Sequence, residues 1–359
     1  MTATAPDPDR VTRLLADTYR IADDVLYPSA ADIDRTGTIP ESHWATLADA
    51  GLFGIAAPLE QDGPGLELNQ ATEIMEVLAS GDLPTAFTWL QHHGVVISLA
   101  GSPNDALRER LLPDAIAGRL RAGVAYAGAI PTPPRMRAER TEDGWRFSGY
   151  APFVSGWGSV DLLQISARDV ETDDVVSAIV PVGTRPSAIT VTPVHLGVAD
   201  ATCTVALTVD DLIVSDAQVV SRVGIDDFFA SQNIGVRING ALPLGIVRRA
   251  AALLDVGGYQ QAARALRERA GEIRARMDTS LDDTDALVAA RADAAQLAVD
   301  AASTLVSADG GRALLRGAPA ERLAREAAFT LVAASRPTLK NVLVHRFSEA
   351  EPDQAPLVE

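Results

Sequence analysis

The spacing of the hydrophobic residues changes twice along the chain, and this constrains the fold more than any other feature. Over residues 11–120 apolar side chains recur every three or four positions, as on one face of a helix. Over residues 122–219 short segments rich in β-branched and aromatic residues replace that pattern, and over 226–347 the helical spacing returns. This order predicts an α+β fold.

The two changes predict three domains and a tail. An N-terminal helical domain is expected over residues 1–120, a central β-barrel domain over 121–222 and a C-terminal helical bundle over 223–347. Roughly ten residues separate the start of one strand from the next, which is typical of a sandwich or barrel. The acidic end, residues 348–359, is predicted to be a frayed tail.

Local signals place individual elements. Asn104 is the expected cap of the helix that follows it. Breaks between the later helices are expected at three places: Gly257 with Gly258, residues 278–285, and Gly310 with Gly311. Strands are predicted at 145–147, 162–165, 175–181, 189–191 and 204–209.

Charge and composition exclude several classes of partner. The chain has 48 acidic and 31 basic residues, a formal charge of -17, which opposes binding to nucleic acid or to an anionic membrane. No apolar run reaches the roughly 20 residues that a membrane-spanning helix needs. One cysteine, Cys203, and a polar, acidic start favour the cytoplasm.

Six motifs, in order along the chain, resemble the acyl-CoA dehydrogenase family. They are the run from Trp44 to Pro58, Arg110 to Pro113, Asp143 to Gly149, Phe153 to Ser155, Val205 to Val214, and Pro319 to Arg322. The resemblance implies a helical domain, a β-barrel and a four-helix bundle, with FAD held where barrel and bundle meet. It also implies an acyl-CoA substrate and an oligomer, homo- or heteromeric, because FAD bridges two subunits in that family.

The resemblance assigns the flavin to Phe153, Val154 and Ser155, whose aromatic ring would cover the isoalloxazine edge while the hydroxyl donates toward N5. Taken alone, the triplet also fits a buried strand followed by a turn serine. Upstream, Tyr126 and the backbone at Ala129 align with a loop that meets the flavin pyrimidine. Here Ala129 replaces the family's threonine.

Further contacts are implied for the rest of the cofactor and for the substrate. Arg264 aligns with the pyrophosphate arginine, and Gly310 with Gly311 resembles the turn over the adenosine; an ordinary surface arginine and a helix-ending glycine pair fit equally. Arg135 is the candidate for a substrate phosphate, or lies on a solvated loop.

His92 and His93 lie on a helix that runs near the acyl chain in the family, so one of them is expected to line the substrate pocket. Adjacent histidines point to different helix faces, so no metal site is expected. The alternative for either is an ordinary structural histidine.

The family's catalytic glutamate has no counterpart. Its two usual positions align with Ala333 and Gly235, neither of which can accept a proton. The catalytic residue is therefore unassigned. In that family a carboxylate removes the α proton of the thioester as the flavin takes a hydride.

Three functions remain open. The resemblance implies an FAD-dependent oxidoreductase that acts on CH–CH bonds of an acyl thioester or related substrate, with an electron-transfer partner. The first alternative is a monooxygenase of the same group, which uses reduced flavin from a partner reductase and needs no glutamate. The second is a non-catalytic subunit of a heteromeric acyl-CoA dehydrogenase.

Overall fold

The computed structural model describes residues 7–183, 187–333 and 337–346, so the predicted acidic tail lies outside the described part. The chain divides into two compact units. The first consists of residues 1–21, 36–71 and 84–230, and the second of residues 22–35, 72–83 and 231–359. The helical segment before residue 120 therefore contributes to both units.

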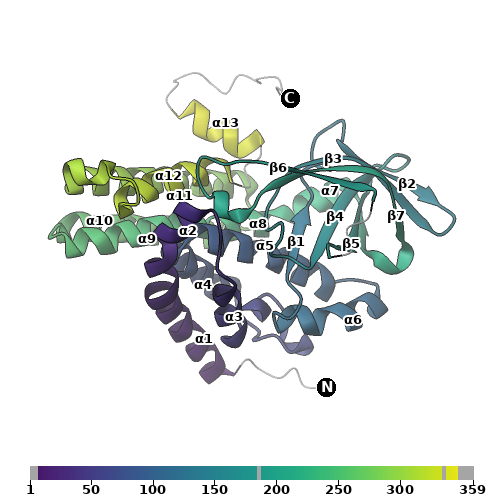
Figure 1. Ribbon diagram of the computed structural model, residues 1–359, viewed down its shortest axis with the longest axis horizontal. Coiled ribbons are helices and arrows are strands. Elements are labelled where there is room, and N and C mark those ends of the chain that lie inside the picture. The colour runs from purple at the N-terminus through teal and green to yellow at the C-terminus, as the bar shows by residue number, and fades with distance from the viewer. Residues whose placement is uncertain (1–6, 184–186, 334–336, 347–359) are drawn as a thin grey trace. The chain divides into compact units, whose positions relative to one another are not determined.

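Helices of the N-terminal third precede the sheet (Figure 1). They are α1 (Pro8–Ile21), α2 (Tyr27–Thr36), α3 (Glu41–Asp49), α4 (Leu68–Gly81), α5 (Leu83–Ala100) and α6 (Asp105–Ile116), with a 3-10 turn, η2, at Leu52–Gly54. The predicted cap of α6 is confirmed, because the Asn104 side chain accepts a hydrogen bond from the Leu107 N–H at 3.1 Å.

The β region of the first unit is one mixed sheet of eight strands. They are β1 (Ala122–Ala125), β2 (Met136–Thr141), β3 (Gly144–Val154), β4 (Leu162–Asp169), β5 (Val175–Pro181), β6 (Ile189–Pro193), β7 (Val205–Ser215) and β8 (Val219–Val223). The order is β6-β7-β3-β2-β4-β5-β8, and β1 pairs with β4. All five predicted strands are present; β1, β2 and β8 were not predicted. The short helix α7 (Ile225–Ala230) follows.

Strand β4 has two parallel partners on one edge. β1 pairs with its first half, with Ala122 opposite Leu162, and β2 pairs with its end, with Arg137 opposite Arg168. The segment between β1 and β2 must therefore leave the sheet and return to the same edge. This brings the segment 126–135 close to β3, which pairs with β2.

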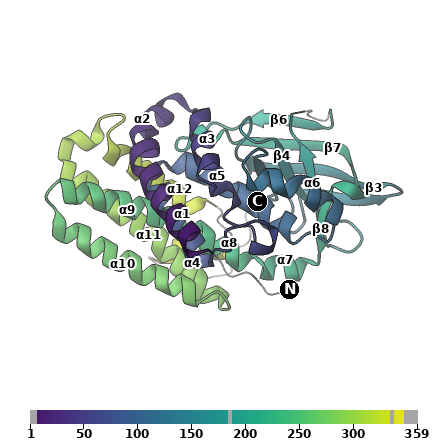
Figure 2. The ribbon, with the colours of Figure 1, turned by 90° about the horizontal axis from the view of Figure 1, so that it is seen from below.

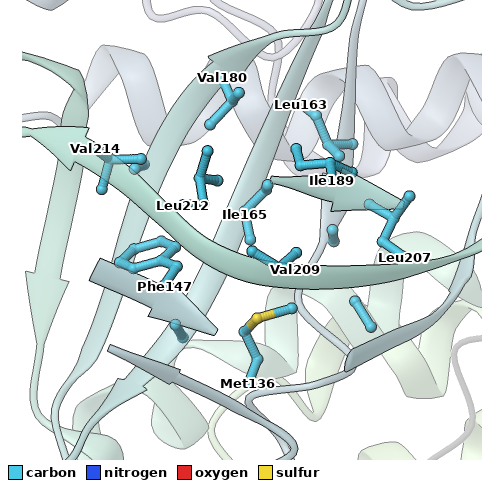
Figure 3. Packing of buried hydrophobic residues seen from close by; sticks show 14 of the residues in the cluster. Met136, Phe147, Leu163, Ile165, Val180, Ile189, Leu207, Val209, Leu212 and Val214 are labelled. Carbon is cyan, nitrogen blue, oxygen red and sulfur yellow. The ribbon is translucent and has the colours of Figure 1, made fainter. Parts of the chain in front are cut away.

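The sheet curls around an apolar core to which strands of both its ends contribute (Figure 3). Phe147 of β3, Ile165 of β4, Val180 of β5 and Leu207 of β7 are buried in one cluster. Within the described residues no ladder joins β6 to β8, so the sheet is barrel-like but open along that seam. The predicted α+β class is confirmed.

Further helices of the second unit follow the sheet in the chain. They are α8 (Gln232–Asn239), α9 (Ala241–Val256), α10 (Gln260–Thr279), α11 (Thr284–Asp309), α12 (Pro319–Val332) and α13 (Pro337–His345), with the 3-10 segment η6 at Gly310–Leu314. Of these, α9 to α12 lie side by side in both ribbon views (Figures 1 and 2). The helix breaks fall where the sequence predicted them. No helix of the described chain meets the length and hydropathy that crossing a bilayer requires.

A close approach sets the packing of α9 on α4. A Cβ at Gly245 would lie 2.6 Å from Ala79 Cβ and 2.7 Å from the Glu76 carbonyl oxygen, closer than real contacts allow. Glycine at this position lets the two helices touch through their backbones.

Buried charge accumulates inside the second unit. Glu326 and Arg322 of α12 are both almost fully buried and form an ion pair at 2.7 Å. The pKa of Glu326 is raised to about 7, chiefly by burial and in part by the nearby Asp82 carboxylate, while Arg322 opposes the rise. Asp34 also lies close enough to raise this pKa.

This pKa predicts a pH-dependent stability. Unfolded Glu326 releases its proton near its ordinary pKa of 4.5, whereas the folded protein keeps it up to about pH 7. Glu326 therefore contributes on the order of 3 kcal/mol to the free energy of unfolding below pH 4.5. This contribution is lost as the pH rises to 7.

Glu326→Gln should remove this pH dependence. The difference in unfolding free energy between the variant and the native protein, measured by urea titration, should therefore rise from pH 4.5 to pH 7. Glu321→Gln, on the same helix but partly exposed, is the matched control and should show no such trend. An equal trend in both variants would refute the assignment to Glu326.

Candidate functional site

A chain of three hydroxyl groups follows the end of β3. The Ser155 and Thr204 oxygens lie 2.8 Å apart, and the Thr204 and Thr202 oxygens are also 2.8 Å apart. The Gly156 N–H donates to the Thr202 carbonyl oxygen at 2.7 Å, which holds the two segments together. Two hydrogen bonds use two of the three hydroxyl protons, so one donor is left for an outside acceptor.

The three residues of the predicted flavin triplet point in different directions. Phe153 is 68% exposed, whereas Val154 is 1% exposed and packs inside the barrel-like core. Ser155 is 9% exposed. A ligand at this face can therefore meet the ring of Phe153 and the hydroxyl of Ser155, while Val154 supports them from inside.

Left-handed backbone is concentrated here. Phe153, Ala199 and Cys203 have φ values of 53°, 57° and 46°, although none is glycine. Phe153 occupies the irregularity between β3 and β7, where the register shifts between Ala151 and Val154. Such conformations cost roughly 1–3 kcal/mol each and are concentrated at functional sites. The surrounding structure holds an exposed phenyl ring in a strained position.

The loop that was expected to meet the flavin lies beside β3. A Cβ at Gly123 would be 3.4 Å from the Ser155 carbonyl oxygen, and one at Gly128 would be 2.3 Å from that of Tyr150. The segment 123–128 therefore runs antiparallel to residues 150–155. Half-buried Tyr126 lies between these two contacts, on the same part of the unit as the triplet.

The backbone groups of Ala129 are less available to a flavin than the sequence predicted. Its side chain is fully buried, its N–H donates to the Tyr126 carbonyl oxygen at 2.9 Å, and its own carbonyl accepts from Arg168 at 3.3 Å. In this conformation both of its backbone groups are engaged within the protein. Arg135, at the end of the loop, has an exposed side chain.

His92 is held by backbone groups on both sides. Its Nδ1 accepts from the Ala122 N–H at 3.1 Å, so its Nε2 carries the proton and donates to the Ala115 carbonyl oxygen at 3.1 Å. Burial lowers the pKa of His92 to about 4. His92 thus ties α5 to α6 and β1 as a neutral ring.

His93, the next residue, is fully buried against Trp89, with ring centroids 4.2 Å apart. Neither of its ring nitrogens has a hydrogen-bond partner. Burial holds the pKa of His93 well below its ordinary value. Both predicted substrate-facing histidines are therefore neutral near pH 7.

A small cavity of about 10 Å³, room for about one water molecule, is lined in part by Thr88 and Val160. A Cβ at Gly156 would be 3.1 Å from Val160 and 3.2 Å from Thr88, and both of these residues line the cavity. Its wall also includes His92 and Trp89. The cavity is therefore one residue away from the triplet.

The remaining predicted cofactor residues belong to the second unit. Arg264 is exposed on α10, and Gly310 and Gly311 are exposed at the end of α11. Ion pairs between Arg269 and Asp300 at 3.6 Å, and between Arg276 and Asp293 at 2.7 Å, set α10 and α11 antiparallel. This places Arg264 toward the same end of the helix pair as the two glycines.

The two positions where the family carries its glutamate are uncharged. Ala333 follows α12 and is buried, and Gly235 lies within α8. Among the described residues no group of three or more His, Cys, Asp or Glu side chains is arranged to hold a metal ion.

Similarity to known proteins agrees with this architecture. Residues 10–119 match the model of the acyl-CoA dehydrogenase N-terminal domain. The structure of a glutaryl-coenzyme A dehydrogenase in complex with glutaryl-CoA superposes with a TM-score of 0.82, covering 96% of both chains at 15% identity. Residues 10–119 thus belong to the acyl-CoA dehydrogenase N-terminal domain family, and the whole chain shares the fold of these enzymes.

Two curated relatives and one more structure show the range of this family. Isovaleryl-CoA dehydrogenase of Pongo abelii is 25% identical over 40% of this chain and 36% of its own length. L-evernosamine nitrososynthase of a Micromonospora species is 33% identical over 43% of this chain and 38% of its own length. The structure of PigA with FAD and proline has a TM-score of 0.78 at 16% identity, over 96% and 98% of the two chains.

The matched region thus spans little more than a third of the length of the curated relatives. Sequence reasoning missed Thr202 and Thr204, because the contact that makes them part of the site joins residues 49 positions apart. No local motif marks them.

The strain at Phe153 can be measured. Phe153→Gly removes the cost of a left-handed side-chain residue and loses little burial, so the free energy of unfolding should stay level or rise by up to about 1 kcal/mol. Tyr150→Gly is the control, because Tyr150 is also exposed on β3 but has no positive φ; it should lose about 1 kcal/mol. Urea unfolding of both variants gives the comparison, and equal losses would contradict the strain assignment.

Proposed function

We propose that this protein is a flavin-dependent oxidoreductase of the acyl-CoA dehydrogenase type, with FAD as its cofactor. The observation that carries the proposal is the hydroxyl chain of Ser155, Thr204 and Thr202, two residues along the chain from the exposed ring of Phe153. If Thr204 donates to Ser155, the Ser155 proton is free to reach a ring nitrogen of the flavin. When bound, the flavin supplies hydride or electron transfer.

The residues present fit such a group. Phe153 offers an apolar face for a planar ring, and Tyr126 lies on the same part of the unit. Arg264, Gly310 and Gly311 are proposed to meet the pyrophosphate and adenosine parts of FAD. Arg135 is the proposed contact for a phosphate of the substrate if that substrate is an acyl-CoA.

Between the two reactions of this group, we favour oxygenation with reduced flavin over dehydrogenation of an acyl thioester. Dehydrogenation needs a carboxylate beside the flavin, and Ala333 and Gly235 supply none. The 33% identity to a nitrososynthase supports the same choice. A flavin reductase is then the proposed partner. A non-catalytic subunit, the third function, would hold no flavin of its own.

FAD retention tests the cofactor assignment. The protein should keep flavin absorbance through gel filtration after incubation with FAD, and Ser155→Ala and Phe153→Ala should each weaken FAD binding by about tenfold, the loss of one hydrogen bond or one stacked ring.

Controls for retention are Ser177→Ala, which breaks a hydroxyl pair at 2.7 Å between β4 and β5, and Ile213→Ala, which truncates an exposed side chain on β7. Both should retain FAD. Unchanged occupancy in Ser155→Ala and Phe153→Ala would remove the site assignment, and a protein that takes up no FAD would favour the subunit function or an enzyme that uses free reduced flavin.

The reaction is tested with the flavin-loaded protein. Under anaerobic conditions butyryl-CoA should leave the flavin absorbance unchanged, because no carboxylate stands at either base position. A flavin reductase with NADH should reduce it, and oxygen should restore it. Rapid bleaching by butyryl-CoA alone would instead establish dehydrogenation.

A further inference from the structure

The hydroxyl chain of Ser155, Thr204 and Thr202 is closed at its Thr202 end. Thr202 is 1% exposed and Thr204 is 5% exposed, so both hydroxyls are shielded from solvent. Among the described residues the Thr202 hydroxyl has a single hydrogen-bond partner, the Thr204 oxygen at 2.8 Å. The Thr204 hydroxyl has two, Thr202 and Ser155. Ser155 is therefore the member of the chain that can meet a ligand.

The closed end gives the chain a direction, because each hydroxyl supplies only one proton. If Ser155 donates to Thr204 and Thr204 to Thr202, the Thr202 proton is buried without an acceptor. If Ser155 and Thr202 both donate to Thr204, the Thr204 proton is buried instead. Donation from Thr202 to Thr204 and from Thr204 to Ser155 leaves the unused proton on Ser155, the most exposed of the three at 9%. The cost of an unsatisfied buried hydroxyl favours this last arrangement by roughly tenfold or more.

The backbone holds the two threonines in contact. Side chains two residues apart on an extended strand are separated by roughly 7 Å, yet the Thr202 and Thr204 oxygens lie 2.8 Å apart. Cys203 between them has a φ of 46°, which bends the chain and brings the two hydroxyls together. The Gly156 N–H, which donates to the Thr202 carbonyl oxygen at 2.7 Å, fixes the same segment to the residue after Ser155. The direction of the chain is therefore built into the fold.

We propose that Thr204, supported by Thr202, is a positioning residue that makes Ser155 an obligatory hydrogen-bond donor, so that the site holds an oxidised flavin ring more tightly than a reduced one. N5 of an oxidised isoalloxazine is an acceptor, whereas N5 of the reduced ring carries a hydrogen. The Ser155 proton therefore suits the oxidised ring and opposes the reduced one. This inference rests on the proposed function, because it takes a flavin to be the ligand at the triplet.

The preference has a consequence for the reduction potential. Tighter binding of the oxidised form lowers the potential of the bound flavin by about 30 mV for each tenfold difference in affinity. One hydrogen bond accounts for a difference of about tenfold. A lower potential makes the bound reduced flavin a stronger electron donor to oxygen, in line with the proposed oxygenation.

The direction of the chain is tested without flavin, by nuclear magnetic resonance of protein isotope-labelled at the Cβ carbons of serine and threonine. In a mixture of equal parts of light and heavy water, a hydroxyl that exchanges slowly splits its Cβ signal in two. Thr202 and Thr204 should each give two signals, because their protons are buried and donated, and Ser155 should give one. Thr202→Val, Thr204→Val and Ser155→Ala identify the signals. A split Ser155 signal beside an unsplit Thr202 signal would mean the opposite direction and would overturn the inference.

The preference for the oxidised ring is tested by measuring the dissociation constants of oxidised FAD and of dithionite-reduced FAD without oxygen. The ratio of the two constants should fall about tenfold in Thr204→Val, which raises the potential of its bound flavin by about 30 mV. Ser155→Ala removes the donor itself and should lose the preference in the same way. Thr204→Ser should restore the native ratio. Thr208→Val, which alters an exposed threonine of β7, is the matched control and should keep it.

The two measurements separate this inference from the proposed function. A protein that takes up FAD with the same ratio in its native form and in Thr204→Val would overturn the inference alone. A protein that takes up no FAD would overturn the flavin function and the preference for the oxidised ring. The exchange measurement would still decide the direction of the hydroxyl chain in that protein.

Discussion

The parallel pairing of β4 with both β1 and β2 is the constraint on which the site depends. Parallel neighbours on one edge cannot be joined by a tight turn, so the chain between Ala125 and Met136 must leave the sheet. That detour presses Gly128 against the Tyr150 carbonyl oxygen and runs beside the end of β3. The parallel pairing of β1 and β2 with β4 therefore brings the segment 126–135 beside the end of β3, where the triplet lies.

The sequence predicted the architecture well because the architecture follows from local spacing. The change from helical to alternating spacing located the sheet, and the strand predicted at 175–181 coincides with β5. Asn104 was predicted as a cap because capping is decided within four residues. β2 was missed because its residues, Met136 to Thr141, carry three charges and no β-branched residue before Thr141; pairing with β3 makes it a strand.

The site was predictable only in part. The sequence marked the triplet, but the exposed Phe153 beside buried Val154 follows from the irregularity of β3 between Ala151 and Val154, which no local pattern predicts. No sequence motif marks the partners of Ser155, because Thr204 and Thr202 reach it through a contact between residues far apart in the chain. The histidines show the opposite case. Their residue type suggested chemistry, but burial and backbone hydrogen bonds make His92 a neutral structural link.

The uncharged state of these histidines also bears on the reaction. The hydroxyls that meet at the triplet are not strong bases near pH 7, and the buried His92 and His93 are uncharged there. The residues that line the cavity include no carboxylate. Removal of a proton from carbon needs a stronger base than a hydroxyl, and residues 333 and 235 supply none. The uncharged Ala333 and Gly235 and the satisfied His92 are thus consistent with the proposed oxygenation, which needs no protein base at these positions.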